Sequence, residues 1–193
     1  MIIDPKAIAI SMAAVVLVFG ATYSHAQSDP HRQSSAATEH SSSFQIPNSM
    51  EIEHEAVHSQ LIELTKAGGR TGEAARRLAG VLDPHFQKEN RDALPPLGLL
   101  VPLSQGKFDC AMTAVLSITG RLQADMPNML AEHEEIRAAT SQLRNAASSE
   151  KNSEGVKFAD QLAAHAQTEE QITYPTALLI GLYVKEKAAQ CPR

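Results

Sequence analysis

Aromatic residues and cysteines are scarce in this chain, and their scarcity narrows the fold class. The 193 residues include no tryptophan, and aromatic side chains make up 4% of the total. Alanine and leucine dominate the apolar residues, a balance that favours helices packed on helices over a sheet. The hydrophobic content of 43% suits one globular domain with an appendage. The sequence therefore predicts an all-α protein with a single core.

The chain also lacks a strong charge of either sign. Its formal net charge is −5, and the lysines and arginines are scattered among acidic residues, so no basic surface for nucleic acid is indicated. The only two cysteines, Cys110 and Cys191, have a spacing that does not indicate a thiolate metal site. A disulfide between them and two separate thiols are equally open, because the distance between their Cα atoms cannot be read from the sequence.

The N-terminus has the pattern of an export signal. Lys6 precedes an apolar run from Ala7 to Ala21, and small residues around Ala26 offer a cleavage site. The interpretation is a signal peptide over residues 1–26, a disordered linker over 27–45 and a globular domain over 46–190. A periplasmic or secreted location follows, with no stable membrane span in the mature chain. Tethering by an uncleaved N-terminal segment is the alternative.

Four long helical segments are expected in the globular part. Apolar spacing and helix-stop residues predict the first over about residues 49–67 and the second over about 71–91, with a bend at Pro84. The third is expected over about 110–147, with a kink or a break near Asp125 because of Pro127. The fourth is expected over about 153–189.

The two halves of the globular part repeat each other. Glu53-His54-Glu55 resembles Glu132-His133-Glu134, and His85-Phe86-Gln87-Lys88-Glu89 resembles His165-Ala166-Gln167-Thr168-Glu169. The separation is 31 residues from His54 to His85 and 32 from His133 to His165. A proline follows ten residues after the later histidine in each half. The matched frame predicts two helix pairs related by a pseudo-twofold axis.

The repeated residues have the chemistry of a metal site. Side chains four residues apart on a helix converge on one point, so each His-x-x-x-Glu element is a helical chelate. Imidazole nitrogens mixed with carboxylates that bridge two ions suit adjacent irons. The candidate metal ligands are His54, His58, His85, Glu89, His133, His165 and Glu169. No catalytic residue outside this set is indicated.

These residues resemble the motif of the hemerythrin-like (HHE cation-binding) family, and the resemblance covers about residues 46–186. The family pattern consists of a histidine, a His-x-x-x-Glu element, a second histidine and a second His-x-x-x-Glu element, one on each helix. It matches His54, His85 with Glu89, His133, and His165 with Glu169. A longer spacing in some members would select Glu170 on the fourth helix. The resemblance implies an up-down-up-down four-helix bundle holding two non-haem iron ions, bridged by carboxylates and by oxide or hydroxide.

One departure from the family pattern concerns the fifth histidine. Oxygen-carrying hemerythrins have a His-x-x-x-His pair on the third helix. Here the residue four positions after His133 is Arg137, and the pair His54 and His58 lies on the first helix. If His58 is a ligand, two six-coordinate irons with about 12 positions keep one open. If it is not, more positions open and redox catalysis is favoured. A second departure is Asn90, which stands where the second half has Glu170.

The function expected from the resemblance is binding of dioxygen or nitric oxide, or iron handling, in an exported compartment. The alternative is a di-iron oxidase or a peroxide-consuming enzyme, and no protein partner is indicated. A zinc hydrolase is a third interpretation, because His54-Glu55-Ala56-Val57-His58 fits the His-Glu-x-x-His pattern. That interpretation leaves the repeat in the second half without a role.

Overall fold

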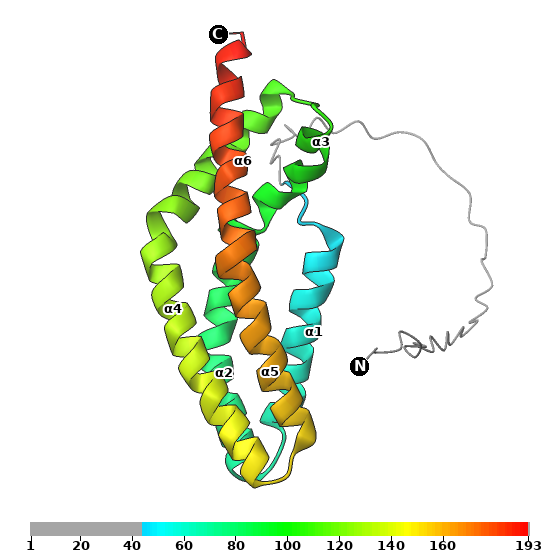
Figure 1. Ribbon diagram of the computed structural model, residues 1–193, viewed down its shortest axis with the longest axis vertical. Helices are drawn as coiled ribbons and strands as arrows, with labels where there is room; N and C mark the ends of the chain where they lie inside the picture. The colour runs from blue at the N-terminus through cyan, green and yellow to red at the C-terminus, as the bar shows by residue number, and fades with distance from the viewer. Residues whose placement is uncertain (1–43, 193) are drawn as a thin grey trace, which may run out of the picture. The chain divides into compact units, whose positions relative to one another are not determined.

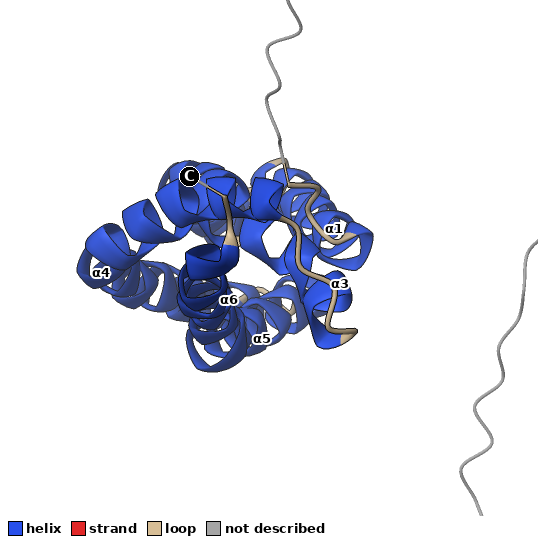
Figure 2. Ribbon diagram, turned by 90° about the horizontal axis from the view of Figure 1, so that it is seen from above, coloured by secondary structure: helices blue, strands red, loops and turns tan. Residues whose placement is uncertain are grey.

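A computed structural model describes residues 44–192, and every regular element in this range is helical (Figures 1 and 2). The main helices are α1 (Asn48–Thr65), α2 (Gly69–Lys88), α4 (Val115–Ser149), α5 (Ser153–Thr168) and α6 (Tyr174–Lys187). A π-helical turn, η1 (Glu89–Ala93), continues α2, and a second, η4 (Glu169–Thr173), joins α5 to α6. Four long helical segments result, as the sequence predicts.

The four segments lie beside one another with alternating direction. Figure 1 shows α1 and α4 running down the view, and α2 and α5–α6 running up it. Between the second and third segments the chain forms short helices, η2 (Pro95–Leu99), α3 (Leu100–Ser104) and η3 (Cys110–Ala114). This arrangement is compatible with a four-helix bundle. Because the connections elsewhere are short, consecutive segments are antiparallel neighbours.

The apolar core consists of two clusters, with buried polar residues between them. One cluster is built on α1, α2, α5 and the C-terminal half of α4, and the other on the N-terminal half of α4, the residues around η2, and α6. Along α4, Met129 belongs to the second cluster and Ile136 to the first, and the buried His133 lies between them. The buried polar residues are therefore flanked by an apolar cluster on each side.

The third segment excludes one of the two forms expected for it, a break near Asp125. α4 continues as one α-helix from Val115 to Ser149 with Pro127 inside it. Figure 1 shows α4 changing direction along its length. A proline removes one helical hydrogen bond and displaces a preceding carbonyl, and packing against α2 and α5 holds the helix together despite this cost. The predicted start at Cys110 falls in a 3-10 turn that precedes α4.

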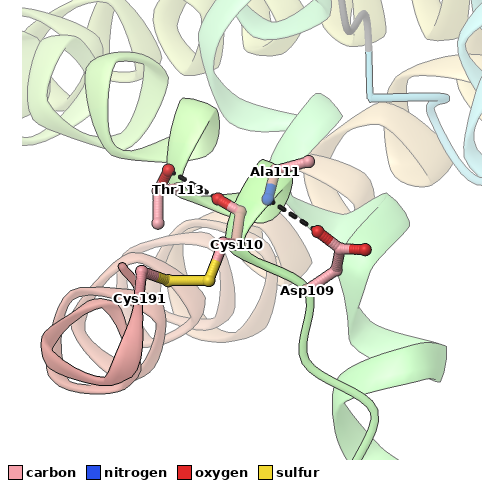
Figure 3. Close-up of a disulfide and its surroundings, with 5 residues drawn as sticks. All are labelled: Asp109, Cys110, Ala111, Thr113 and Cys191. Carbon is pink, nitrogen blue, oxygen red and sulfur yellow. Dashed lines mark hydrogen bonds between the residues drawn. A yellow bond between two sulfur atoms is a disulfide. The ribbon is translucent and has the colours of Figure 1, made fainter. Parts of the chain in front are cut away.

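The structure pairs the two cysteines. Cys110 and Cys191 form a disulfide with an Sγ–Sγ distance of 2.09 Å and a Cα–Cα distance of 5.7 Å (Figure 3). The bond ties the start of η3 to the chain just after η5 (Ala188–Gln190). Asp109 caps the same turn, since its side chain accepts a hydrogen bond of 2.8 Å from the amide of Ala111. The disulfide thus fixes the C-terminal end of the last helix to the connector.

The signal peptide and most of the linker predicted for residues 1–45 lie outside the described residues. Among residues 44–192, no helix is long and apolar enough to span a membrane.

Candidate metal centre

Four histidines and two glutamates from all four segments meet in the interior. His54 comes from α1, His85 and Glu89 from α2 and its π turn, His133 from α4, and His165 and Glu169 from α5 and its π turn. The Glu89 side chain is fully buried, and the others are at most 8% exposed. Such residues are rarely buried together without pairing or a metal ion. They form two groups whose potential ligand atoms lie within 4.8 Å of one another.

The first group, site A, consists of His85, Glu89, His133 and Glu169. The His85 Nε2 atom lies 3.5 Å from Glu89 Oε1, and the His133 Nε2 atom lies 3.5 Å from Glu169 Oε2. Two imidazole nitrogens and two carboxylate oxygens thus face one point.

The second group, site B, consists of His54, His165 and Glu169. Glu169 Oε1 lies 3.3 Å from His54 Nε2 and 2.9 Å from His165 Nε2. Glu89 also reaches this site, because its Oε2 atom lies 3.8 Å from His54 Nε2. Each glutamate therefore turns one oxygen towards site A and the other towards site B. The two carboxylates thus lie between the two groups of histidines.

Local helix geometry explains the position of both glutamates. Glu89 and Glu169 each lie one helical turn after a histidine and start a π-helical turn. The amide of Leu94 bonds the carbonyl of Glu89, and the amide of Tyr174 bonds that of Glu169, both with the i to i−5 pattern. Pro95 and Pro175 come next in the chain, and a widened turn avoids the clash of a proline ring with the carbonyl four residues earlier. Such turns occur frequently at functional sites.

Carboxylates outside the two sites orient three of the four histidines. The Nδ1 atom of His85 lies 2.9 Å from Glu132, that of His133 lies 2.8 Å from Glu170, and that of His165 lies 3.1 Å from Glu53. A carboxylate only accepts hydrogen bonds, so each Nδ1 carries the proton and each Nε2 faces inwards unprotonated in the neutral ring. Pairs of this kind raise the basicity of metal-binding histidines.

His54 is the exception, because its buried Nδ1 atom has no hydrogen-bond partner. By the repeat, the position equivalent to Glu170 is Asn90, which is exposed to solvent. The His54 ring instead stacks on Phe86, with ring centroids 4.4 Å apart and an angle of 17° between the planes. The two sites therefore differ in the support that their histidines receive.

Basic side chains hold two of the outer carboxylates. Lys88 bonds Glu132 and lies 3.5 Å from Asp125, and Arg137 donates a hydrogen bond of 2.5 Å to Glu170. Although partial burial opposes ionisation of Glu132 and Glu170, these cations and the histidines lower the pKa of both carboxyls. Both groups are therefore ionised at neutral pH and accept from the histidine N–H groups.

In the metal-free protein the buried carboxylates raise the pKa of the neighbouring histidines. Burial lowers the pKa of His165, but the adjacent Glu169 and Glu53 outweigh it and raise the pKa to about 9. The same balance, with Glu89 as the main partner, raises the pKa of His85. Protons on these rings offset the negative charge of Glu169, whose own pKa is lowered by three histidines against the effect of burial. Cations are thus favoured at this centre.

Two unpaired atoms show that the residues fit a metal ion. Glu89 Oε2 and His165 Nε2 are buried and have no hydrogen-bond partner. The His165 nitrogen lies 2.9 Å from Glu169 Oε1 but without the geometry of a hydrogen bond. A buried polar atom left unpaired costs about 1–3 kcal/mol. A metal ion in site B would contact the His165 nitrogen, and Glu89 Oε2 lies 3.8 Å from His54 Nε2 at the same site.

Tyr174 also reaches the centre. Its hydroxyl donates a hydrogen bond of 2.5 Å to Glu89 Oε1 and lies 3.0 Å from His133 Nε2. Burial and the nearby Glu89 raise the pKa of this phenol, so it stays protonated in the metal-free protein. Its ring also belongs to the second apolar cluster.

The structure brings together six of the seven residues proposed as ligands and places His58 elsewhere. The His58 ring is about half exposed, and its Nε2 atom lies 3.6 Å from Asp83 Oδ1. His54 and His58 therefore do not converge on one point as the His-Glu-x-x-His interpretation requires. Glu169 and Glu170 are the two candidates for the carboxylate ligand on the fourth segment. Glu169 lies between the two sites, whereas Glu170 contacts the outer nitrogen, Nδ1, of His133.

Sequence reasoning assigned no role to the outer carboxylates Glu53 and Glu132. A signal was present, since a glutamate directly precedes a histidine at matched positions of the two halves.

Comparison with protein-family models, with curated proteins and with solved structures gives no match to this chain.

Proposed function

We propose that this protein is a non-haem di-iron protein of the hemerythrin-like type, with one iron ion in site A and one in site B. The observation that carries the proposal is the pair of buried groups that share Glu169, with Glu89 facing both. The donors are two histidines and two carboxylate oxygens for each ion. The sequence motif and this geometry contain the same six residues.

The donor set favours iron on chemical grounds. Imidazole suits zinc, copper, iron and nickel, and carboxylates favour harder ions, so a balanced mixture without thiolate suits iron. A zinc ion would be satisfied by four donors, whereas iron has about six positions. Iron in these sites would keep positions free for a small ligand. Bound iron would supply the affinity for dioxygen or nitric oxide and the ability to change oxidation state.

The buried surroundings suit a small uncharged ligand. The centre lies between two apolar clusters, and a low-polarity environment admits diatomic molecules more readily than ions. We therefore propose that dioxygen or nitric oxide binds at the iron pair.

A second candidate function is a di-iron oxidase or a peroxide-consuming enzyme. The position of His58 favours it, because without a fifth histidine more than one position stays open at the pair. The two functions differ in outcome, since a binding protein returns its ligand unchanged and an enzyme consumes it.

The disulfide supports the proposal of an exported location. Disulfides persist in the periplasm and outside the cell and are rare in the cytosol, and Cys110 is bonded to Cys191. The proposal combines this bond with the predicted signal peptide, and a membrane-tethered form remains its alternative.

The test is elemental analysis of the purified protein after reconstitution with ferrous iron, together with visible spectra before and after exposure to air and to nitric oxide. We expect about two irons per chain and a spectrum that changes with the ligand. Reversal under vacuum would support binding, and steady consumption of peroxide would support the enzyme.

Glu169→Gln should lower the iron content of both sites, and Glu135→Gln, at an exposed position of the same bundle, is the matched control. Full iron content in the Glu169 variant would contradict the proposal. Zinc in place of iron would contradict the choice of metal, and no metal at all would leave the chain a structural bundle.

A further inference from the structure

Tyr174 introduces an oxygen atom among the metal-facing atoms of site A. Its hydroxyl lies 3.0 Å from His133 Nε2, 3.3 Å from His85 Nε2 and 2.5 Å from Glu89 Oε1. All three are atoms that the proposed function assigns to one ion. The side chain is 1% exposed, so its packing fixes the hydroxyl in this place.

These distances match those between donor atoms on one metal ion. With metal–donor bonds of about 2.1 Å, neighbouring donors of an octahedral ion lie about 3.0 Å apart. The Tyr174 oxygen has this relation to three donors at once. A hydroxyl that only donated a hydrogen bond to Glu89 would not need two histidine nitrogens within 3.3 Å.

The π turn is the reason why Tyr174 faces the centre. In an α-helix, Thr173 would follow one turn after Glu169 on the same face. The bond from the Tyr174 amide to the Glu169 carbonyl widens this turn by one residue, which moves Tyr174 onto that face. The first half has the same turn, and the equivalent position there is occupied by the buried Leu94. The oxygen donor is thus present in one half only.

We propose that Tyr174 is a ligand of the metal ion in site A and binds it through the phenolate oxygen. This inference rests on the proposed function. When the ion binds, an oxygen–metal bond forms, the phenol O–H bond breaks, and the proton goes to solvent. No electron is transferred in this step. Leu94 cannot supply an equivalent donor to site B.

The two ions are therefore unequal. Site A has five protein donors, which are two histidines, two carboxylate oxygens and Tyr174. Site B has four, which are two histidines and two carboxylate oxygens. The small ligand consequently binds at site B. His54 of site B also lines a surface cleft of about 630 Å³ between α1 and α2.

The test compares the wild-type protein with Tyr174→Phe after reconstitution with iron and oxidation to the ferric state. A phenolate bound to ferric iron gives a strong visible charge-transfer band, and excitation in this band enhances the Raman lines of the tyrosine ring. We expect both signals in the wild type and their complete loss in Tyr174→Phe, with iron content unchanged. Tyr183→Phe, on the same helix but at a partly exposed position, is the matched control and should keep both signals.

The results separate this inference from the proposed function. Iron at two per chain with the same band in Tyr174→Phe, or with no band in the wild type, would overturn the tyrosine ligand and leave the iron pair standing. A wild-type protein that takes up no iron would overturn both.

Zinc supplies a second readout that does not depend on iron spectra. Addition of zinc to the metal-free protein should produce the near-ultraviolet difference band of ionised tyrosine in the wild type and in Tyr183→Phe, and none in Tyr174→Phe. A band of equal size in Tyr174→Phe would overturn the proposal.

Discussion

Replacement of Glu170 by glutamine removes the carboxylate that holds the outer nitrogen of His133, at a distance of 2.8 Å. The ligand atom of His133 and the packing of its ring remain in place, so the change acts on the metal through the orientation and basicity of one histidine. Loss of such an outer partner typically weakens metal affinity about 10- to 100-fold, or about 1.4–2.7 kcal/mol. We expect this loss at site A.

The cost for the fold itself should be small. Glu170 also accepts a hydrogen bond from Arg137, but this guanidinium is partly exposed and has a second partner in Glu134 at 2.7 Å. Removal of Glu170 therefore leaves no buried unpaired cation. Glu134→Gln is the matched control, because Glu134 binds the same arginine from an exposed position.

The opposite change at site B should strengthen binding. His54 lacks an outer partner, and Asn90 occupies the position that is equivalent to Glu170. Asn90→Glu supplies a carboxylate there, within the cleft that both residues line. We expect a gain of up to about 10-fold, smaller than the loss at site A because the new side chain starts from an exposed position.

The assay is competition for zinc or ferrous iron with a chelator of known affinity, and denaturant unfolding of the metal-free variants checks the fold. If Glu170→Gln kept an affinity within twofold of both the wild type and Glu134→Gln, outer carboxylates would not tune this centre, and the reasoning would be refuted.

Three further predictions concern the remaining features. His58→Ala should leave the metal content unchanged, since the His58 ring is half exposed and lies 3.6 Å from Asp83; loss of one ion on elemental analysis would restore His58 as a ligand. Reduction of the Cys110–Cys191 bond, which closes a separation of 81 residues, should lower the free energy of unfolding by about 2–4 kcal/mol. Denaturant unfolding with and without reductant measures it, and equal midpoints would contradict it.

The third prediction is a pH dependence. Against the opposing effect of burial, Glu169 raises the pKa of His165 to about 9 in the metal-free protein, above the unfolded value of about 6.5. This proton therefore stabilises the metal-free fold below about pH 6.5, and the stabilisation is lost as the pH rises through about 9. Metal must displace the proton, so apparent affinity should rise from pH 6 to 9. Calorimetric titrations in buffers of different ionisation enthalpy that detected no proton release at pH 7 would contradict it.

The sequence predicted the helical segments and six residues of the centre because both depend on spacing along one helix. His85 with Glu89 and His165 with Glu169 are one turn apart, so their convergence follows from helix geometry alone. The repeat then indicated the histidines of the other two segments. The continuity of α4 through Pro127 was not predictable in this way, because it depends on packing against neighbouring helices.

Contacts between helices account for most of what the sequence left open. The pairing of His165 with Glu53 joins residues 112 positions apart, and the register of α1 against α5 decides it. The same holds for Cys110 and Cys191, whose proximity depends on where α6 ends. Tyr174 faces the centre only because of the π turn before it, and a scheme based on regular α-helical spacing places Thr173 there instead.

The central claim is that two metal ions lie side by side and share Glu89 and Glu169. Crystals of the iron-reconstituted protein, measured with X-rays at the iron absorption edge, test it most directly. We expect two anomalous peaks about 3.5 Å apart, one between His85 and His133 and the other between His54 and His165. A single peak, or peaks away from these histidines, would contradict it.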